Sequence, residues 1–122
     1  MGMKWLLNYI CTKYGTVTEG KHKGCGMGVG SDDNGVKSMN GVVWTKLMFI
    51  KGTKMIEEVR IESLKSYKII SKTAKATVIL ITYADGEQSR VYLPAVDGNG
   101  QPWSSDRVGL VLGALSSVPV EE

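Results

Sequence analysis

The clearest pattern of hydrophobic and polar positions lies between residues 42 and 94. Residues 42 to 50 form a run of β-branched, aromatic and other apolar side chains that two polar residues interrupt, and residues 51 to 53 have the composition of a turn. Residues 57 to 62 then alternate with a period of two, which is typical of a half-exposed strand. After a kink at Ser63 the apolar pattern resumes. We therefore predict an antiparallel sheet over residues 42–94.

A further hairpin is predicted around Asp85-Gly86. A two-residue Asp-Gly loop needs positive φ at both central positions, which Asp tolerates and Gly favours, so the pair predicts a type I′ turn. The register that follows sets Ala84 opposite Glu87, Thr82 opposite Ser89, Leu80 opposite Val91 and Val78 opposite Leu93. We expect the last two pairs to face the core, with Ile79 and Ile81 on the other face.

The chain before this sheet gives a weaker signal. Residues 1–19 have apolar positions near a helical spacing, with Gly15 as a C-cap, but a strand fits nearly as well. Residues 20–41 are rich in glycine and have no apolar period, so we predict a long mobile loop. Within this segment Gly24, Gly26, Gly28 and Gly30 alternate. Such glycines belong either to a flexible segment or to a strand that another backbone approaches closely.

Residues 104–118 are predicted to form a C-terminal amphipathic helix. One of two serines offers an N-cap oxygen, and Asp106 adds negative charge to the first turn. The apolar positions recur at 0, +3, +4 and +7, at Val108, Val111, Leu112 and Leu115. Gly109 and Gly113 have the spacing that lets a helix pack closely, and we expect them to lie against the sheet.

Size and composition indicate one domain over residues 1–122, with 43% hydrophobic and 22% charged residues. No run of about 18 apolar residues exists, so no helix is expected to span a bilayer. The two cysteines are too few for a disulfide framework, and a reducing cytoplasm is the expected location.

The net charge of +3 comes mainly from lysine, with arginine only at Arg60, Arg90 and Arg107. Proteins that bind nucleic acid usually gather Arg and Lys on one face, with aromatic side chains for stacking. This composition lacks that combination, so nucleic acid is not an expected partner.

Four lysines lie where two predicted strands turn over: Lys65, Lys68, Lys72 and Lys75. As ordinary surface residues they would be solvated and would protect a hairpin end and a sheet edge. As functional residues they would form a small basic platform for anionic lipid headgroups or an acidic partner, since each lysine near an anionic surface contributes about 1 kcal/mol. They are the candidate binding residues of this sequence.

No group of residues meets the requirements of a catalytic or metal site. The stretch from Gly15 to His22 approaches a phosphate-binding P-loop, but His22 stands where a magnesium-binding Ser or Thr is required. His22 and Cys25 have a spacing that metal sites use, yet one histidine and two separated cysteines are a poor ligand set for zinc. We therefore expect no enzymatic activity, no cofactor and no metal.

Two stretches point to a family. Residues 61–70, Ile-Glu-Ser-Leu-Lys-Ser-Tyr-Lys-Ile-Ile, and residues 77–87, which include the Asp-Gly pair, resemble a strand-entering segment and the long central strand with its hairpin in small bacterial pleckstrin-homology-like (PH-like) domains. The resemblance implies a mainly β fold with α (α+β): a bent antiparallel sheet or partly open barrel that the C-terminal helix closes at one end. Residues 1–41 have no counterpart in this comparison.

The family resemblance also implies a class of function. PH-like proteins are mostly non-enzymatic, and they bind proteins, self-associate through sheet edges, or bind lipid. We expect a protein-interaction or self-association module, with a protein partner or a homo-oligomer, that uses an open strand edge and the glycine-rich loop. Peripheral binding to anionic lipid is the first alternative. A small phage-type inhibitor of a host enzyme is the second, because the chain is short and lacks catalytic groups.

Overall fold

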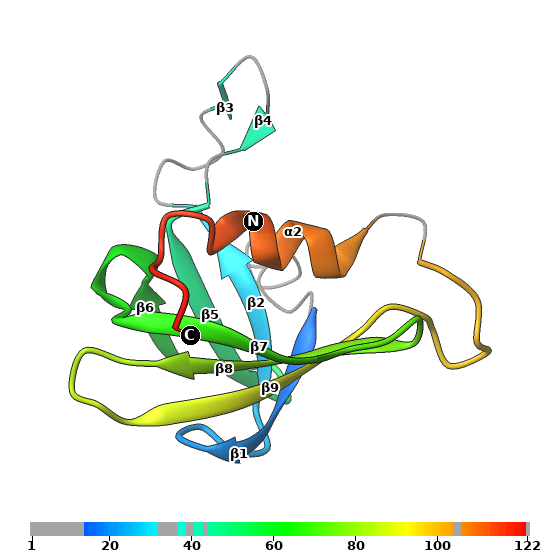
Figure 1. The fold of residues 1–122 in the computed structure, drawn as a ribbon, viewed down its shortest axis with the longest axis horizontal. Helices are drawn as coiled ribbons and strands as arrows, with labels where there is room; N and C mark the ends of the chain where they lie inside the picture. Colours follow the sequence, from blue (N-terminus) through cyan, green and yellow to red (C-terminus); the bar gives the residue numbers. More distant parts are fainter. Residues whose placement is uncertain (1–13, 32–36, 39–40, 43, 104–105, 122) are drawn as a thin grey trace.

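The computed structural model describes residues 14–31, 37–38, 41–42, 44–103 and 106–121. Seven antiparallel strands form one bent, open sheet in the order β6-β5-β2-β1-β9-β8-β7 (Figure 1). The strands are β1 Gly15–Gly20, β2 Gly26–Gly30, β5 Lys46–Lys51, β6 Lys54–Arg60, β7 Ser66–Lys72, β8 Ala76–Thr82 and β9 Gln88–Pro94. A separate two-stranded sheet pairs β3 Lys37–Ser38 with β4 Gly41–Val42, and helix α2 is Arg107–Ala114. The expectation of a mainly β fold with a C-terminal helix is confirmed.

The predicted loop over residues 20–41 is wrong in its first part. Residues 21–24 form a turn, and β2 follows as an internal strand between β1 and β5. Met27 and Val29 face the hydrophobic core, which leaves the alternating glycines on the opposite face. There a Cβ added to Gly30 would lie 2.8 Å from the Sδ of Met48, a buried residue of β5. The alternative of a strand with a close neighbour is therefore correct at Gly30, whereas Gly24 lies in the turn before β2 with open space around it. Residues 32–36 and 39–40 lie outside the described residues.

Of residues 1–19, predicted as a helix or a strand, the structure describes residues 14–19. Gly15 begins β1 and so is not the C-cap of a helix. A Cβ there would lie 2.9 Å from the carbonyl oxygen of Tyr92 on β9, so glycine lets the two strands approach. Residues 1–13, for which a helix or a strand was expected, lie outside the described residues.

The hairpin of β5 and β6 agrees with the sequence pattern. The two strands are joined by a tight turn at residues 52–53, where Gly52 has a φ of 65°. The predicted first strand starts later than expected, at Lys46, because Val42 belongs to β4. The kink at Ser63 is confirmed as a 3₁₀ turn, η1, over Ile61–Ser63.

The hairpin of β8 and β9 exists, but its predicted register is wrong by one residue. The loop holds three residues, 84–86: the amide of Tyr83 donates to the carbonyl of Glu87 at 2.8 Å, and Gly86 has a φ of 91°. An Asp85 carboxylate oxygen accepts from the Glu87 amide at 2.9 Å, which fixes this wider turn. The pairs are then Ile79 with Val91 and Ile81 with Ser89. Because one residue of slip exchanges the faces of a strand, Ile79 and Ile81 point into the core, contrary to expectation.

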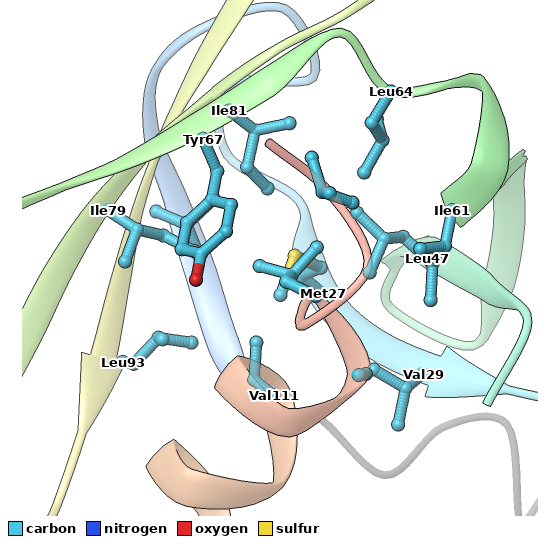
Figure 2. Packing of buried hydrophobic residues seen from close by; sticks show 14 of the residues in the cluster. Met27, Val29, Leu47, Ile61, Leu64, Tyr67, Ile79, Ile81, Leu93 and Val111 are labelled. Carbon is cyan, nitrogen blue, oxygen red and sulfur yellow. The ribbon is translucent and has the colours of Figure 1, made fainter. Parts of the chain in front are cut away.

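The core lies between the concave face of the sheet and helix α2 (Figure 2). Val108, Val111 and Leu115 are buried as predicted. The N-cap is Asp106, whose carboxylate accepts from the Gly109 amide at 2.8 Å, rather than a serine; residues 104–105 are outside the described part of the chain. The expected packing of the helical glycines on the sheet is wrong, since Gly109 and Gly113 are exposed.

Gly20 offers a test of the approach of β1 to β9. Its φ is 84°, and an added Cβ would clash with the carbonyl oxygen of Gln88. We expect Gly20→Ala to lower the free energy of unfolding by about 3 kcal/mol, from left-handed strain plus overpacking. Gly24→Ala is the matched control, because Gly24 has a φ of 90° with open space around it, and it should cost about 1 kcal/mol. Urea unfolding measures both, and equal losses would contradict the proposed close approach.

Candidate interaction surface

The sheet has two edges, β6 and β7, each of which pairs with one neighbouring strand. The two strands follow each other in the sequence and are joined by η1, but no ladder connects them. An edge strand presents unpaired backbone N–H and C=O groups, so both are places where another chain could add a strand. Their side chains and neighbours differ.

The edge of β7 already carries a short segment of this chain. The amide of Tyr67 donates to the carbonyl of Pro119 at 3.0 Å, and the amide of Glu121 donates to the carbonyl of Tyr67 at 2.7 Å. Tyr67 and Val120 thereby form an isolated parallel bridge. Figure 1 shows the C-terminal segment running down against β7 after α2. We call residues 119–121 the C-terminal segment; just before it, Val118 is buried in the core.

Beyond Tyr67 the edge of β7 is open within the described residues. Tyr67 directs both of its backbone groups away from β8, and backbone direction alternates with period two, so Ile69 directs its own groups outward as well. A bulge between Ile69 and Ser71 interrupts the pairing with β8. Ile69 and Ile70 are 42% and 41% exposed, which is unusual for two adjacent isoleucines on an edge strand. This stretch therefore combines free backbone groups with exposed apolar side chains.

The four candidate lysines line β7 and do not gather at one turn. Lys72 and Lys75 flank the turn between β7 and β8, Lys68 lies within β7, and Lys65 precedes it. Lys65 and Lys72 are seven residues apart along nearly extended chain, or about 23 Å. All four are exposed, and among the described residues none of them forms an ion pair. They form a row of unpaired positive charges along the open edge.

The β6 edge is different, because two of its carboxylates already have side-chain partners, a lysine ammonium and a histidine ring nitrogen. Glu58 accepts from the ammonium of Lys46 at 2.8 Å, and Glu57 lies 2.5 Å from Nε2 of His22. Ile56 on this edge is 45% exposed, much like the isoleucines of β7. Its exposed apolar area is therefore comparable, but the row of unpaired lysines is missing.

A polar and aromatic cluster lies where the turn after β1 meets β5 and β8. His22 has a φ of 67°, in the left-handed region that few non-glycine residues adopt. Its ring stacks on Phe49 at a centroid distance of 4.4 Å, and Tyr83 meets both rings edge-on at 6.4 Å. The bond to Glu57 completes the fixation of His22. Sequence alone does not bring His22, Phe49, Glu57 and Tyr83 together, because they come from four separate parts of the chain.

Hydrogen bonds in the same cluster tie the first hairpin to the last. The Ser89 hydroxyl is fully buried and donates to the carbonyl of Lys21 at 2.5 Å. Its single proton is then used, so the Tyr83 hydroxyl is the donor in the 2.7 Å bond between the two side chains. The Lys21 ammonium lies 5.1 Å from the centre of the Tyr83 ring and pairs with Asp85 and Glu87. The cluster thus holds the turn of residues 21–24 against β8 and β9.

This arrangement does not assemble a catalytic site from the residues considered above. Cys25 is buried as a free thiol, and its amide donates a backbone hydrogen bond of 3.0 Å to the carbonyl of His22. Ser89 has no solvent exposure, so its hydroxyl cannot reach a substrate. Across the described ranges, no three side chains of His, Cys, Asp or Glu lie together as a metal site would require. The geometry of the cluster is that of a structural clamp.

Comparison with protein-family models, with curated proteins and with solved structures finds no match to this chain. Among the described residues, no helix has the length and apolar character needed to cross a bilayer.

The clamp gives a prediction for alkaline pH. Burial raises the pKa of Tyr83 to about 12, and the nearby carboxylates of Glu57, Asp85 and Glu87 act in the same direction. Above pH 10 the unfolded chain loses this proton while the folded protein retains it, so stability falls as pH rises towards 12. The contribution is about 1.4 kcal/mol per pH unit in this window. Tyr83→Phe should unfold in urea with a shallower loss of stability from pH 10 to 12; identical slopes would contradict the burial argument.

Proposed function

We propose that this chain is a non-catalytic protein-interaction module whose docking element is the open edge of β7. The observation that carries the proposal is the stretch after Tyr67, where outward backbone groups coincide with the exposed side chains of Ile69 and Ile70. The C-terminal segment supports the proposal further, because its isolated bridge at Val120 uses the backbone groups that Tyr67 directs to this side. Strand addition of this kind draws affinity from backbone hydrogen bonds and specificity from side chains.

The PH-like family remains part of this proposal. A bent antiparallel sheet with one C-terminal helix packed on its core is the architecture that the resemblance implies. The same family accounts for a role in binding rather than in catalysis. A phage-type inhibitor of a host enzyme would be one special case of a protein partner docking at β7.

A different protein is favoured over a second copy of this chain as the partner. If two β7 edges paired antiparallel around Ile70, Lys68 of each copy would lie near Lys72 of the other. Directly opposed like charges destabilise a strand pair. Anionic lipid is the second candidate, favoured by the four exposed, unpaired lysines. However, a lipid surface would give the outward backbone groups of the β7 edge no regular hydrogen-bond partners, whereas an added strand would.

Ile69→Lys tests the docking element, with Ile56→Lys on β6 as the matched control. Both isoleucines lie on edge strands and are similarly exposed, so neither change should disturb folding. Peptides selected from a random phage-displayed library against the unaltered chain should slow amide hydrogen exchange in β7. Their affinity should fall at least about tenfold in Ile69→Lys, because a charge replaces apolar contact area, and should hold in Ile56→Lys.

Two results would count against this function. Selected peptides that bind Ile69→Lys as well as the unaltered chain would move the docking site away from β7. Flotation with vesicles containing anionic lipid, lost at high salt, together with a failed peptide selection, would favour the lipid alternative.

A further inference from the structure

The C-terminal segment shows which kind of strand the β7 edge accommodates. Its two hydrogen bonds to Tyr67 use backbone groups alone, so they impose no sequence. The side chain of Val120 stays 58% exposed, which means that little apolar area holds the segment in place. An occupant held by two backbone bonds and little burial is one that a longer strand can replace.

The positive charge along β7 favours some replacement strands over others. Lys65, Lys68, Lys72 and Lys75 lie along the edge without ion pairs in the described residues, whereas the carboxylates of Glu62 and Glu87 are paired with Arg60 and Lys21. Within the part of the chain that the structure describes, β7 itself has no acidic residue, and Glu121 of the C-terminal segment is the acidic residue bonded to this edge. An extended chain rises about 3.3 Å per residue, so a strand along β7 would pass within a Debye length of several of these lysines.

We infer that the partner of the β7 edge is an extended acidic peptide with an apolar residue, and that it competes with the C-terminal segment for this edge. The inference rests on the proposed function and adds the chemistry of the partner and an internal competitor. The C-terminal segment, Pro-Val-Glu, is itself a short example of that chemistry. Its Glu121 is bonded through its backbone to Tyr67, the residue next to Lys68 in β7.

Glu121→Pro should release the C-terminal segment from β7 with little change elsewhere in the fold. Proline lacks the amide hydrogen that Glu121 donates to Tyr67, while Val118 remains to anchor the end of the helix in the core. Glu121→Gln is the matched control, because it removes the same charge but keeps the amide. Deletion of residues 119–122 provides a second released form.

The probe is a fluorescent synthetic peptide, Ser-Ser-Val-Pro-Val-Glu-Glu, and binding is followed by anisotropy. We expect Glu121→Pro and the deletion to bind it about tenfold more tightly than Glu121→Gln, the fold-change that one to two net hydrogen bonds would give. The affinity for this acidic peptide should fall as the salt concentration rises. It should also fall in Lys68→Glu but not in Lys54→Glu, a lysine on the opposite edge, and a peptide ending in Lys-Lys should bind more weakly.

The outcomes separate this inference from the proposed function. Equal binding of the acidic and basic peptides, with protection of the Ile69 amide from exchange, would overturn the inference and leave β7 as the docking edge. Unchanged affinity on release of the C-terminal segment would overturn the competition. A dimer in sedimentation that protects Ile69 would identify a second copy as the occupant and overturn the acidic partner. If no peptide protects Ile69 in any variant, both proposals fail.

Discussion

The whole sheet depends on the pairing of its first strand with its last. β1 pairs with β2 on one side and with β9 on the other, and so joins the group β6-β5-β2 to the group β9-β8-β7. The pairs with β9, such as Val17 with Val91, connect residues far apart in sequence, and their loop-closure entropy opposes folding. Gly15 and Gly20 permit this contact because side chains there would meet the backbone of β9. The clamp of Lys21, Tyr83 and Ser89 holds the same junction at one end.

Much of the fold follows from local patterns, and the errors have identifiable physical causes. The half-exposed strand β6, the kink at η1 and the buried face of α2 were predictable because each depends on a short period in the sequence. β2 was missed because three of its five residues are glycines, whose lack of side chains hides the period that a strand would show. The register of β8 and β9 was missed because Asp-Gly also fits a three-residue loop, which the Asx bond of Asp85 favours.

The candidate interaction surface was only partly predictable from the sequence. The lysines could be found because they recur in a short stretch, and an open edge was expected from the resemblance. Their spread along β7 depends on where the strand begins and ends. The bridge from Val120 to Tyr67 has no local signal, because it joins the end of the chain to its middle. The same applies to His22, whose partners Phe49, Glu57 and Tyr83 are brought to it only by the folded sheet.

The bulge between Ile69 and Ser71 has a consequence for polymerisation. A regular, flat edge would let neighbouring molecules stack side by side without limit, as in a fibril. Here the regular backbone spacing of β7 breaks between Ile69 and Ser71, before pairing with β8 resumes at Ser71. Such a bulge bends a strand and increases its local twist. A strand from another chain could therefore pair regularly with only a few residues of β7 before the bulge interrupts the hydrogen-bonding register. The bulge therefore limits any strand pairing at this edge to fewer residues than open-ended aggregation requires.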